Sequence, residues 1–421
     1  MKRLFTIGGL VLAVFLGSGA YVYFLSTTST LERAESFQFR RMQAARVGED
    51  GVYRFFYATN RIPKAANEGA ETLLEERFGA QRDGQLRFGR FDTAIRPTLG
   101  LGMWLDAGMW FLEEEIRILD QTPLERADFA AQLRQMVTRS PKRSLLVLVH
   151  GFRTDFPHAL RGTAFLSHIL DIDTPVLVFD WPADQGSSLG GYRRAQRLAT
   201  ESAAELAATL RLIVDDIAPE RIWLVANSMG AQVVADTFSL LYRDPAWADA
   251  PPEIAQVVLT APDVSHARFT EQFRHELATL ADHTTVYVSA NDRALLVSRA
   301  INRGRRLGES TISKADATPA GAADPAWENA TDTLPEETLE MELAEIQDVL
   351  ELLEPDSEGV TLVDVTPVNR TRNFHNFSFE VPEYFDDIFM RLLNEETPEN
   401  RLRYRFVTPE GKHYSVLTRG R

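Results

Sequence analysis

The chain has 421 residues, which suits one large α/β domain with insertions or two smaller domains. A hydrophobic content of 44% and a charged content of 25% are ordinary for a globular protein and permit a sizeable core. The net charge of −15 disfavours a nucleic-acid partner, and the absence of cysteine excludes disulfides, thiolate metal sites and a cysteine nucleophile.

An apolar run at residues 4–25 follows Lys2 and Arg3 directly. A helix over this run is long enough to cross a bilayer core of roughly 30 Å, and the preceding basic residues predict that its N-terminal end stays in the cytoplasm. We therefore expect residues 1–25 to form a transmembrane signal anchor in the bacterial inner membrane. A polar stalk at 26–46 and a domain at 47–421 would then face the periplasm. The alternative is a signal peptide cleaved near residues 16–20, which would secrete the domain.

Two strands and a helix are predicted at the start of the domain. Residues 52–59 are rich in aromatic and β-branched side chains, as in a strand, residues 62–85 are expected to form a loop, and 85–92 is a second candidate strand. Residues 97–121 carry no assignment. Thr122 and Glu125 match a capping box with Pro123 at the first helical position, which predicts a helix from there to about residue 137.

From residue 144 onward, apolar runs of strand length alternate with helical patterns. Strands are predicted at 144–149, 175–180, 221–226, 254–260 and 284–289, and helices at 156–170, 193–216 and 230–243. This alternation is typical of an α/β fold with a mostly parallel sheet flanked by helices and right-handed crossovers. Residues 359–365 are expected to be the last strand, followed by a helix at 383–394 and a hairpin-like stretch.

An acidic insertion, residues 308–358, interrupts this alternation before the last expected strand. It contains 15 acidic residues and one lysine, so the rest of the chain is close to neutral. Low hydrophobicity and high charge predict disorder over 310–334, and apolar residues at helical spacing predict an acidic helix over 336–353. The insertion is either a solvated linker with a surface helix, or a lid or docking segment for a protein partner.

The strand predicted at 221–226 runs directly into Ala-Asn-Ser-Met-Gly at 226–230 and then into a helix. This context is typical of a nucleophile elbow, a sharp turn that lifts the hydroxyl of Ser228 above the sheet edge. Gly230 and the small Ala226 let strand and helix pass closely, although Ala226 stands where a glycine is usual. The alternative is an ordinary helix start with serine at the N-cap.

A serine nucleophile needs a base, and the base needs an acid that orients it. Asp292 and Asp263 each follow a predicted strand, at the sheet edge where sites of open α/β sheets gather. We favour Asp292, which follows the later strand, and keep Asp263 as the alternative acid. His375 lies shortly after the last expected strand, between two phenylalanines, and is the predicted base. The other histidines are assigned surface or structural roles on helices, early loops or the polar tail.

The residues after the strand at 144–149 are expected to form an oxyanion-hole loop. Gly151 allows the backbone to approach a substrate closely. The amides of Phe152 and Met229 are the predicted donors to a developing oxyanion. His150 is then predicted to brace the loop rather than to act as a base.

Several of these motifs together resemble the bacterial domain-of-unknown-function 900 group, an esterase/lipase-like branch of the α/β-hydrolase superfamily. The resemblance is carried by residues 56–61, 149–152, 179–182, 191–192, 226–230 and 289–295, and more weakly by the segment around His375. It implies an α/β-hydrolase fold and a serine-hydrolase activity, and it implies no substrate. Asn227 stands where this group commonly has histidine, and Asn376 where serine is frequent, but neither change removes a triad residue.

The sequence therefore predicts a membrane-anchored serine hydrolase that cleaves a small-molecule or lipid carboxylic ester through an acyl-enzyme. No metal or organic cofactor is implied. An epoxide or haloalkane hydrolase is disfavoured, because its elbow nucleophile would be an aspartate. An envelope acyltransferase, or a non-catalytic envelope protein on a hydrolase scaffold, are the alternatives.

Overall fold

The computed structural model describes residues 42–48, 52–64, 77–95, 116–289, 292, 295, 360–369, 371, 377–393, 403–407 and 413–418. The strands are β1 (Val52–Pro63), β2 (Phe78–Ile95), β3 (Ile116–Leu124), β4 (Ser144–Val149), β5 (Val176–Asp180), β6 (Arg221–Asn227), β7 (Ile254–Thr260), β8 (Ala281–Val288), β9 (Val360–Asp364), β10 (Arg403–Val407) and β11 (His413–Leu417). They form one 11-stranded sheet in the order β10-β11-β9-β8-β7-β6-β4-β5-β1-β2-β3.

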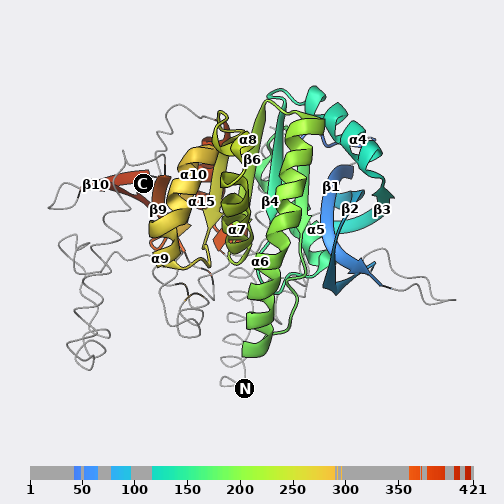
Figure 1. Cartoon of the computed structure of the whole chain (residues 1–421). Helices are drawn as coiled ribbons and strands as arrows, with labels where there is room; N and C mark the ends of the chain where they lie inside the picture. Colours follow the sequence, from blue (N-terminus) through green and yellow to red (C-terminus); the bar gives the residue numbers. More distant parts are fainter. Residues whose placement is uncertain are drawn as a thin grey trace, which may run out of the picture.

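The helices of the described residues connect these strands and cover both faces of the sheet (Figure 1). They are α4 (Arg126–Arg139), α5 (Phe156–Leu170), α6 (Leu189–Leu212) with the π-helical turn η3 (Ile213–Ile217), α7 (Gly230–Tyr242), α8 (Pro245–Ala248), α9 (His266–Arg268), the π-helical turn η4 (Phe269–Phe273), α10 (Arg274–Leu280), α14 (Phe377–Glu380) and α15 (Pro382–Leu393).

The central strands are parallel, and antiparallel pairs occur only toward the two edges of the described sheet. Parallel pairing runs without interruption from β1 through β5, β4, β6, β7, β8 and β9 to β11. β2 and β3 extend one side as antiparallel strands, and β10 pairs antiparallel with β11 on the other. This arrangement confirms the predicted mostly parallel sheet flanked by helices.

The order of the strands reverses at β4, and this reversal sets the layers. β4 leads through α5 to β5 on one side, whereas β5 leads through α6 back past β4 to β6. Because parallel crossovers are right-handed, the two opposite directions put α5 and α6 on opposite faces. α6, α7 and α10 pack in series on one face (Figure 1), and α5 contacts α15. The carboxyl ends of β4 and β6 meet at this switch point, where open α/β sheets bind ligands.

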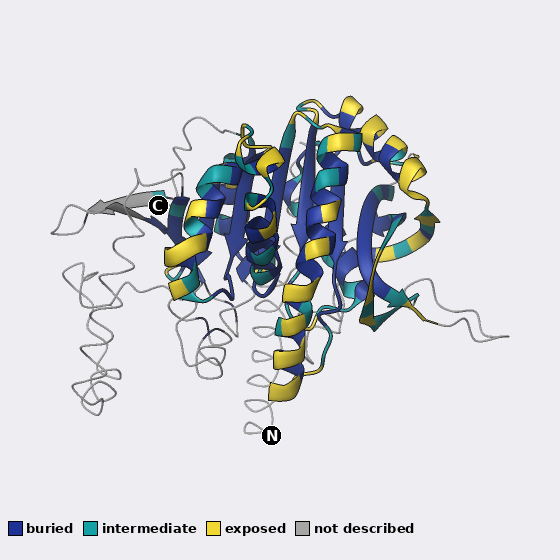
Figure 2. Ribbon diagram, viewed as in Figure 1, coloured by how far each residue is buried: buried dark blue, intermediate teal, exposed yellow. Residues whose placement is uncertain are grey.

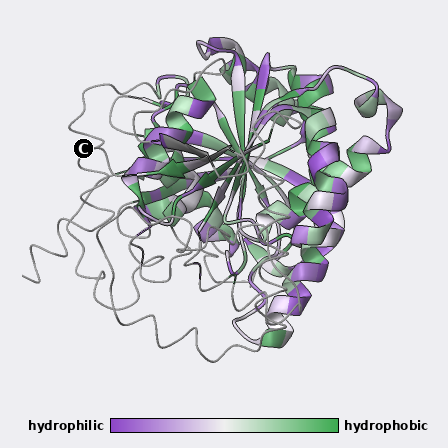
Figure 3. Cartoon of the chain, turned by 90° about the vertical axis from the view of Figure 1, so that its left-hand side faces the viewer, coloured by the Kyte–Doolittle hydropathy of each residue, from purple (hydrophilic) through white to green (hydrophobic). Residues whose placement is uncertain are grey.

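The sheet is the core of the molecule. Every residue of β4, β5 and β7 is buried, as expected for strands covered on both faces, and Figure 2 shows the exposed residues gathered on the outer sides of the helices. Figure 3 looks along the sheet and shows its strands turned progressively against one another, the twist that L-residues impose.

The predicted helix start at residues 122–125 is wrong. Thr122 and Pro123 belong to β3, whose pairing with β2 continues to Leu124, and α4 begins at Arg126. Glu125 is the N-cap residue, but its side chain makes no capping hydrogen bond. Pairing with a neighbouring strand, which no local pattern reports, prevailed over a capping-box signal.

Other predicted helix and strand boundaries also differ from those in the structure. β2 spans Phe78–Ile95 rather than 85–92, so it takes part of the segment expected as loop, and it pairs along β1. α6 begins at Leu189, where the Ser188 side chain accepts from the Gly191 N–H, and ends in η3. The helices between β7 and β8 were not predicted, and His283 lies in β8 rather than on a helix or early loop.

The predicted last strand, now β9, is not the last strand of the sheet. The expected C-terminal hairpin is β10 and β11, and β11 pairs with β9 in parallel. The antiparallel hairpin therefore extends the sheet instead of standing apart from it.

Several predicted segments fall partly or wholly outside the described residues. These are the anchor at 1–25, most of the stalk and the acidic insertion at 308–358. The last stalk residues contact the domain: Met42 and Ala45 are buried, and the Ala44 N–H donates to the Asp173 carboxylate at 2.7 Å. Within the part of the chain that is described, no helix is both long and apolar enough to cross a membrane.

Candidate active site

Ser228 occupies the turn between β6 and α7 in a conformation that few serines adopt. Its φ is 52°, in the left-handed region, which costs energy for a side chain with a Cβ. The surrounding backbone compensates, because the Ser228 N–H donates to the Thr260 carbonyl at 2.9 Å and its own carbonyl accepts from the N–H groups of Asp263 at 3.1 Å and Ala231 at 3.0 Å. Three segments therefore hold this strained residue at the carboxyl edge of the sheet.

Two glycines make the turn sterically feasible. A Cβ at Gly230 would lie 2.6 Å from the carbonyl oxygens of both His150 and Val149, closer than any side chain can approach. A Cβ at Gly151 would lie 3.0 Å from the Ser228 Cβ and 3.1 Å from the Asn227 carbonyl oxygen. The loop after β4 thus lies directly against the serine, whereas the sequence analysis assigned Gly230 to the passage of strand and helix and Gly151 to the approach of a substrate.

The two predicted oxyanion donors lie on either side of this contact. Met229 follows Ser228 and is the N-cap residue of α7, and Phe152 follows Gly151. The hydrogen bonds among the described residues include none from the N–H of either residue outside regular helix and strand bonding. Neither N–H is engaged by these bonds, and the role of the two amides as oxyanion donors stays a prediction.

The two candidate acids differ in their contacts. Asp292 is buried, and its Oδ1 accepts from the Leu295 N–H at 3.1 Å, an arrangement like that of a helix N-cap. Asp263 is also buried, and its Oδ2 accepts from the Tyr192 hydroxyl at 2.7 Å. Both follow strands that lie next to one another, β7 and β8, so both lie at the same edge of the sheet as Ser228.

The predicted base lies outside the described residues. His375 belongs to the segment 372–376, directly before α14, which begins at the buried Phe377. The triad of Ser228, His375 and Asp292 consequently remains a prediction, as does the preference for Asp292 over Asp263.

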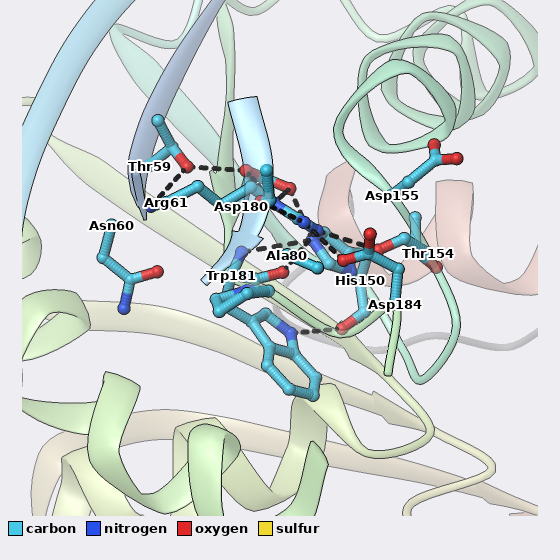
Figure 4. A network of polar contacts seen from close by, with 12 residues as sticks. Thr59, Asn60, Arg61, Ala80, His150, Thr154, Asp155, Asp180, Trp181 and Asp184 are labelled. Carbon is cyan, nitrogen blue, oxygen red and sulfur yellow. Dashed lines mark hydrogen bonds and ion pairs between the residues drawn. The ribbon is translucent and has the colours of Figure 1, made fainter. Parts of the chain in front are cut away.

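A buried charged cluster, which the sequence analysis did not assemble, lies beside the loop after β4 (Figure 4). Arg61 on β1 is fully buried, and its Nε donates to both carboxylate oxygens of Asp180 at the end of β5, at 3.0 and 2.8 Å. Its Nη atoms donate to the Asp184 carboxylate and to the carbonyl oxygens of Gly79, Thr154 and Trp181. All five N–H groups of the buried guanidinium donate a hydrogen bond, so none of its donors is left without an acceptor.

The members of this cluster keep one another ionised. Burial alone would raise the pKa of Asp180, but the charge of Arg61 and hydrogen bonds from His150 and Thr59 outweigh it, so the pKa is lowered. Burial alone would lower the pKa of Arg61, but the charges of Asp180 and Asp184 outweigh it and the pKa is raised. Asp180 therefore remains a carboxylate inside the protein.

His150 links this cluster to the loop that approaches Ser228. Its Nδ1 lies 3.1 Å from the Gly151 carbonyl oxygen and its Nε2 lies 3.0 Å from Oδ1 of Asp180. Its ring stacks on Trp181 with a 5.8 Å centroid distance, and the Trp181 indole N–H donates to the His150 carbonyl at 2.9 Å. Both ring nitrogens and the backbone of His150 are thus engaged, which confirms its predicted role as a brace.

The sequence contained a partial signal for this cluster. Residues 56–61 and 179–182 were noted as motifs, but nothing local in them says that Arg61 and Asp180 pair across 119 positions. The described residues include no group of three or more His, Asp or Glu side chains that could hold a metal ion.

Comparison with known families matches residues 125–332 to the model described as alpha/beta hydrolase of unknown function (DUF900). This part of the chain belongs to that family. The matched span of this α/β hydrolase holds Ser228, both candidate acids and both predicted oxyanion donors, whereas Arg61 lies before it and His375 after it. A search among curated proteins gave no match.

Proposed function

We propose that this α/β hydrolase is a membrane-anchored serine esterase that cleaves carboxylic esters of small molecules or lipids. The observation that carries the proposal is the conformation of Ser228, with φ at 52° between a buried strand and a helix. Gly151 and Gly230 bring the β4 loop against that serine as the oxyanion loop of a hydrolase requires. A serine that only capped a helix would not need this strain.

The proposed reaction proceeds through an acyl-enzyme. Ser228 Oγ attacks the acyl carbon while His375 takes the hydroxyl proton, and the amides of Phe152 and Met229 donate to the oxyanion. The tetrahedral intermediate collapses, and His375 delivers the proton to the departing alcohol. Asp292 holds the imidazole tautomer and stabilises the imidazolium. A water molecule, deprotonated by His375, then hydrolyses the acyl-enzyme.

A fluorophosphonate probe and Ser228→Ala test this proposal together. The purified protein should be labelled at Ser228 and should hydrolyse short-chain aryl esters. Ser228→Ala should lose both properties, with turnover falling about a thousandfold or more, because triad residues act as a unit. Undiminished turnover by a folded Ser228→Ala variant would exclude the mechanism.

The same experiment separates the two alternatives. Labelling of Ser228 with turnover that requires an added acceptor alcohol would identify an envelope acyltransferase. No labelling and no turnover in the folded protein would identify a non-catalytic scaffold.

The proposed location is the inner membrane, with the catalytic domain in the periplasm. Lys2 and Arg3 ahead of the apolar run at 4–25 support this orientation. Protease added to intact spheroplasts should digest the domain, and the full chain should remain in the membrane fraction. Protection from the protease would show that the domain faces the cytoplasm. Recovery of the domain as a soluble periplasmic protein would identify a cleaved signal peptide.

The acidic insertion is either a solvated linker, a docking segment for a protein partner or a lid over the site, and the lid hypothesis can be tested directly. It follows the strand that leads to Asp292 and precedes the strand that leads toward His375, so its ends connect to segments of the proposed site. Replacement of residues 310–356 by a short Gly-Ser linker should change kcat/KM for long acyl esters more than for short ones. Unchanged values for both would indicate a linker or a docking segment for a protein partner.

A further inference from the structure

An open groove of about 680 Å³ lies along the N-terminal half of α6, away from the contacts described above. Its volume is in the range of small-molecule sites. In Figure 1 this end of α6 projects beyond the lower edge of the sheet, and in Figure 2 it is largely exposed. The lining residues are Arg193, Gln196, Arg197, Thr200 and Glu201.

Two arginines give this groove an uncompensated positive charge. Arg193 and Arg197 are one helical turn apart and exposed, and neither forms a hydrogen bond or ion pair with another described residue. Like charges at this spacing repel each other. The one carboxylate in the lining, Glu201, is paired with Arg82 at 3.2 Å, so it does not neutralise them. An anion between the two guanidinium groups would remove the repulsion.

One tyrosine connects the groove to the proposed site. Gln196 Nε2 donates to the Tyr192 hydroxyl at 3.2 Å, and that hydroxyl donates to Asp263 at 2.7 Å. The Tyr192 ring also packs edge-on against Phe152, with ring centroids 5.6 Å apart. The backbone N–H of Asp263 in turn donates to the Ser228 carbonyl at 3.1 Å.

The spacing along α6 sets how far such a molecule would have to reach beyond Tyr192. Tyr192 and Arg197 are separated by about 7.5 Å along the helix axis, at about 1.5 Å per residue. A molecule whose ester group lies at Ser228 would extend past Phe152 and Tyr192 and along α6 to place a charged end between the arginines.

We infer that the groove binds a carboxylate or phosphate carried by the substrate, so that the substrates are acidic esters. This inference rests on the proposed ester hydrolysis at Ser228. Arginine suits the role, because its planar N–H donors match two oxygens of a carboxylate or phosphate. In a chain with a net charge of −15, a local positive groove also selects where an anionic molecule approaches.

Kinetics on paired esters test the inference. The substrates are p-nitrophenyl monoesters of dicarboxylic acids from succinate to sebacate, each compared with the neutral monocarboxylic ester of equal length. The protein should prefer an acidic ester of intermediate or greater length, and added salt should reduce that preference. Arg193→Gln with Arg197→Gln should lower kcat/KM for the acidic ester about a hundredfold, or roughly tenfold for each charge-assisted contact, and leave the neutral ester within about twofold.

Arg194→Gln is the matched control. It removes the same charge from the same helix, but Arg194 donates to the Gln185 carbonyl at 3.1 Å and does not line the groove. This variant should keep the preference for acidic esters. Equal loss in the control and in the double variant would show a general charge effect and overturn the inference.

A binding measurement separates failure of the inference from failure of the proposed function. Ser228→Ala protein should bind monomethyl sebacate more tightly than the neutral methyl decanoate in calorimetry, and the double arginine variant should lose this difference. If esters are hydrolysed without any acidic preference, the inference fails and the esterase proposal stands. If no ester is hydrolysed but the arginines still favour monomethyl sebacate over methyl decanoate, the esterase proposal fails and the anion site stands. Absence of the binding difference overturns the site in either case.

Discussion

Two buried polar clusters lie on opposite sides of β6 and satisfy their charges differently. Beside β4, Arg61 uses all five N–H groups on Asp180, Asp184 and backbone carbonyls. Beyond β8, the Tyr287 hydroxyl donates to Asp387 on α15 at 2.6 Å, and Arg403 on β10 contacts the same carboxylate. The Nε of Arg403 is buried and has no hydrogen-bond partner among the described residues.

The two clusters therefore depend on opposite protonation states, one on an ionised carboxylate and the other on neutral hydroxyls. The Arg61 cluster depends on a carboxylate that must stay charged, and it supports the loop with the predicted oxyanion amide of Phe152. The second cluster depends on hydroxyls that must stay neutral. Burial raises the pKa of Tyr287 well above its usual value, and the nearby charge of Asp387 raises it further. Burial also raises the pKa of Tyr384, whose hydroxyl lies 2.6 Å from that of Thr260.

The largest effect on activity is expected at one of the two candidate acids, Asp292 and Asp263, which follow β8 and β7. Asp292→Asn should lower kcat about ten-thousandfold, because an amide favours the wrong tautomer of the base. Asp263→Asn should cause a far smaller loss, since the amide oxygen can still accept from Tyr192. Steady-state kinetics on a short aryl ester, with circular dichroism as a folding control, decide between them. The reverse order of the two losses would make Asp263 the catalytic acid.

Replacing each arginine with methionine tests whether the two clusters contribute unequally to stability. Arg61→Met leaves Asp180 buried with hydrogen bonds from Thr59 and His150 but without its cation, and it also removes the donor to Asp184 and three backbone carbonyls, so it should cost about 3–5 kcal/mol in the free energy of unfolding. Arg403→Met should cost less, because Tyr287 still donates to Asp387 and one buried N–H already lacks a partner. Urea unfolding at neutral pH measures both. An equal or greater loss for Arg403→Met would contradict the contrast.

Acid should weaken the first cluster. The pKa of Asp180 is lowered in the folded protein, so its contribution is fully present above the unfolded value of about 3.9 and is lost as the pH falls through the folded pKa. The free energy of unfolding of the wild type should therefore fall steeply below about pH 4, and Asp180→Asn should remove part of that slope.

Asp83 provides a control for this loss of stability at acidic pH. Its hydrogen bond from Arg87 lowers its pKa to about 2, but the pair is on the surface, where solvent screens the interaction. Asp83→Asn should change the acid slope much less than Asp180→Asn. A larger change for the surface variant would show that burial of the Arg61 cluster does not govern acid stability.

Alkaline pH should weaken the second cluster, and this is the smallest of the expected effects. The raised pKa of Tyr287 means that its contribution is fully present below the unfolded value of about 10 and is lost as the pH rises toward the folded pKa. Tyr287→Phe removes one hydrogen bond and should cost about 1 kcal/mol at neutral pH. Denaturant unfolding between neutral pH and pH 11 should show a shallower alkaline decline in the variant than in the wild type.

Much of the fold and part of the site followed from local patterns. The apolar runs that became β4, β6 and β7 were predicted nearly to the residue, because strands buried on both faces need continuous apolar sequence. Ser228 and Gly230 were identified because a sharp turn between strand and helix restricts the residue types within it.

Long-range pairing could not be predicted in the same way. The start of α4 was misplaced because β3 pairs with β2 through Leu124, and the sheet does not end at β9 because the hairpin joins it through β11. In both cases the deciding hydrogen bonds come from a strand that is distant in the sequence, so they cannot be predicted from the neighbouring residues alone.

By itself, the sequence determined the alternation of strands and helices, the elbow at Ser228 and the candidate acids, since each depends on periodicity or steric limits within a few residues. Only the tertiary structure decided that Arg61 pairs with Asp180, that His150 fastens the loop against Ser228, and that Arg193 and Arg197 line a groove beside Tyr192. The physical reason is that burial and charge pairing depend on which surfaces the folded chain brings together, and Arg61, His150, Asp180 and Ser228 lie far apart in the sequence.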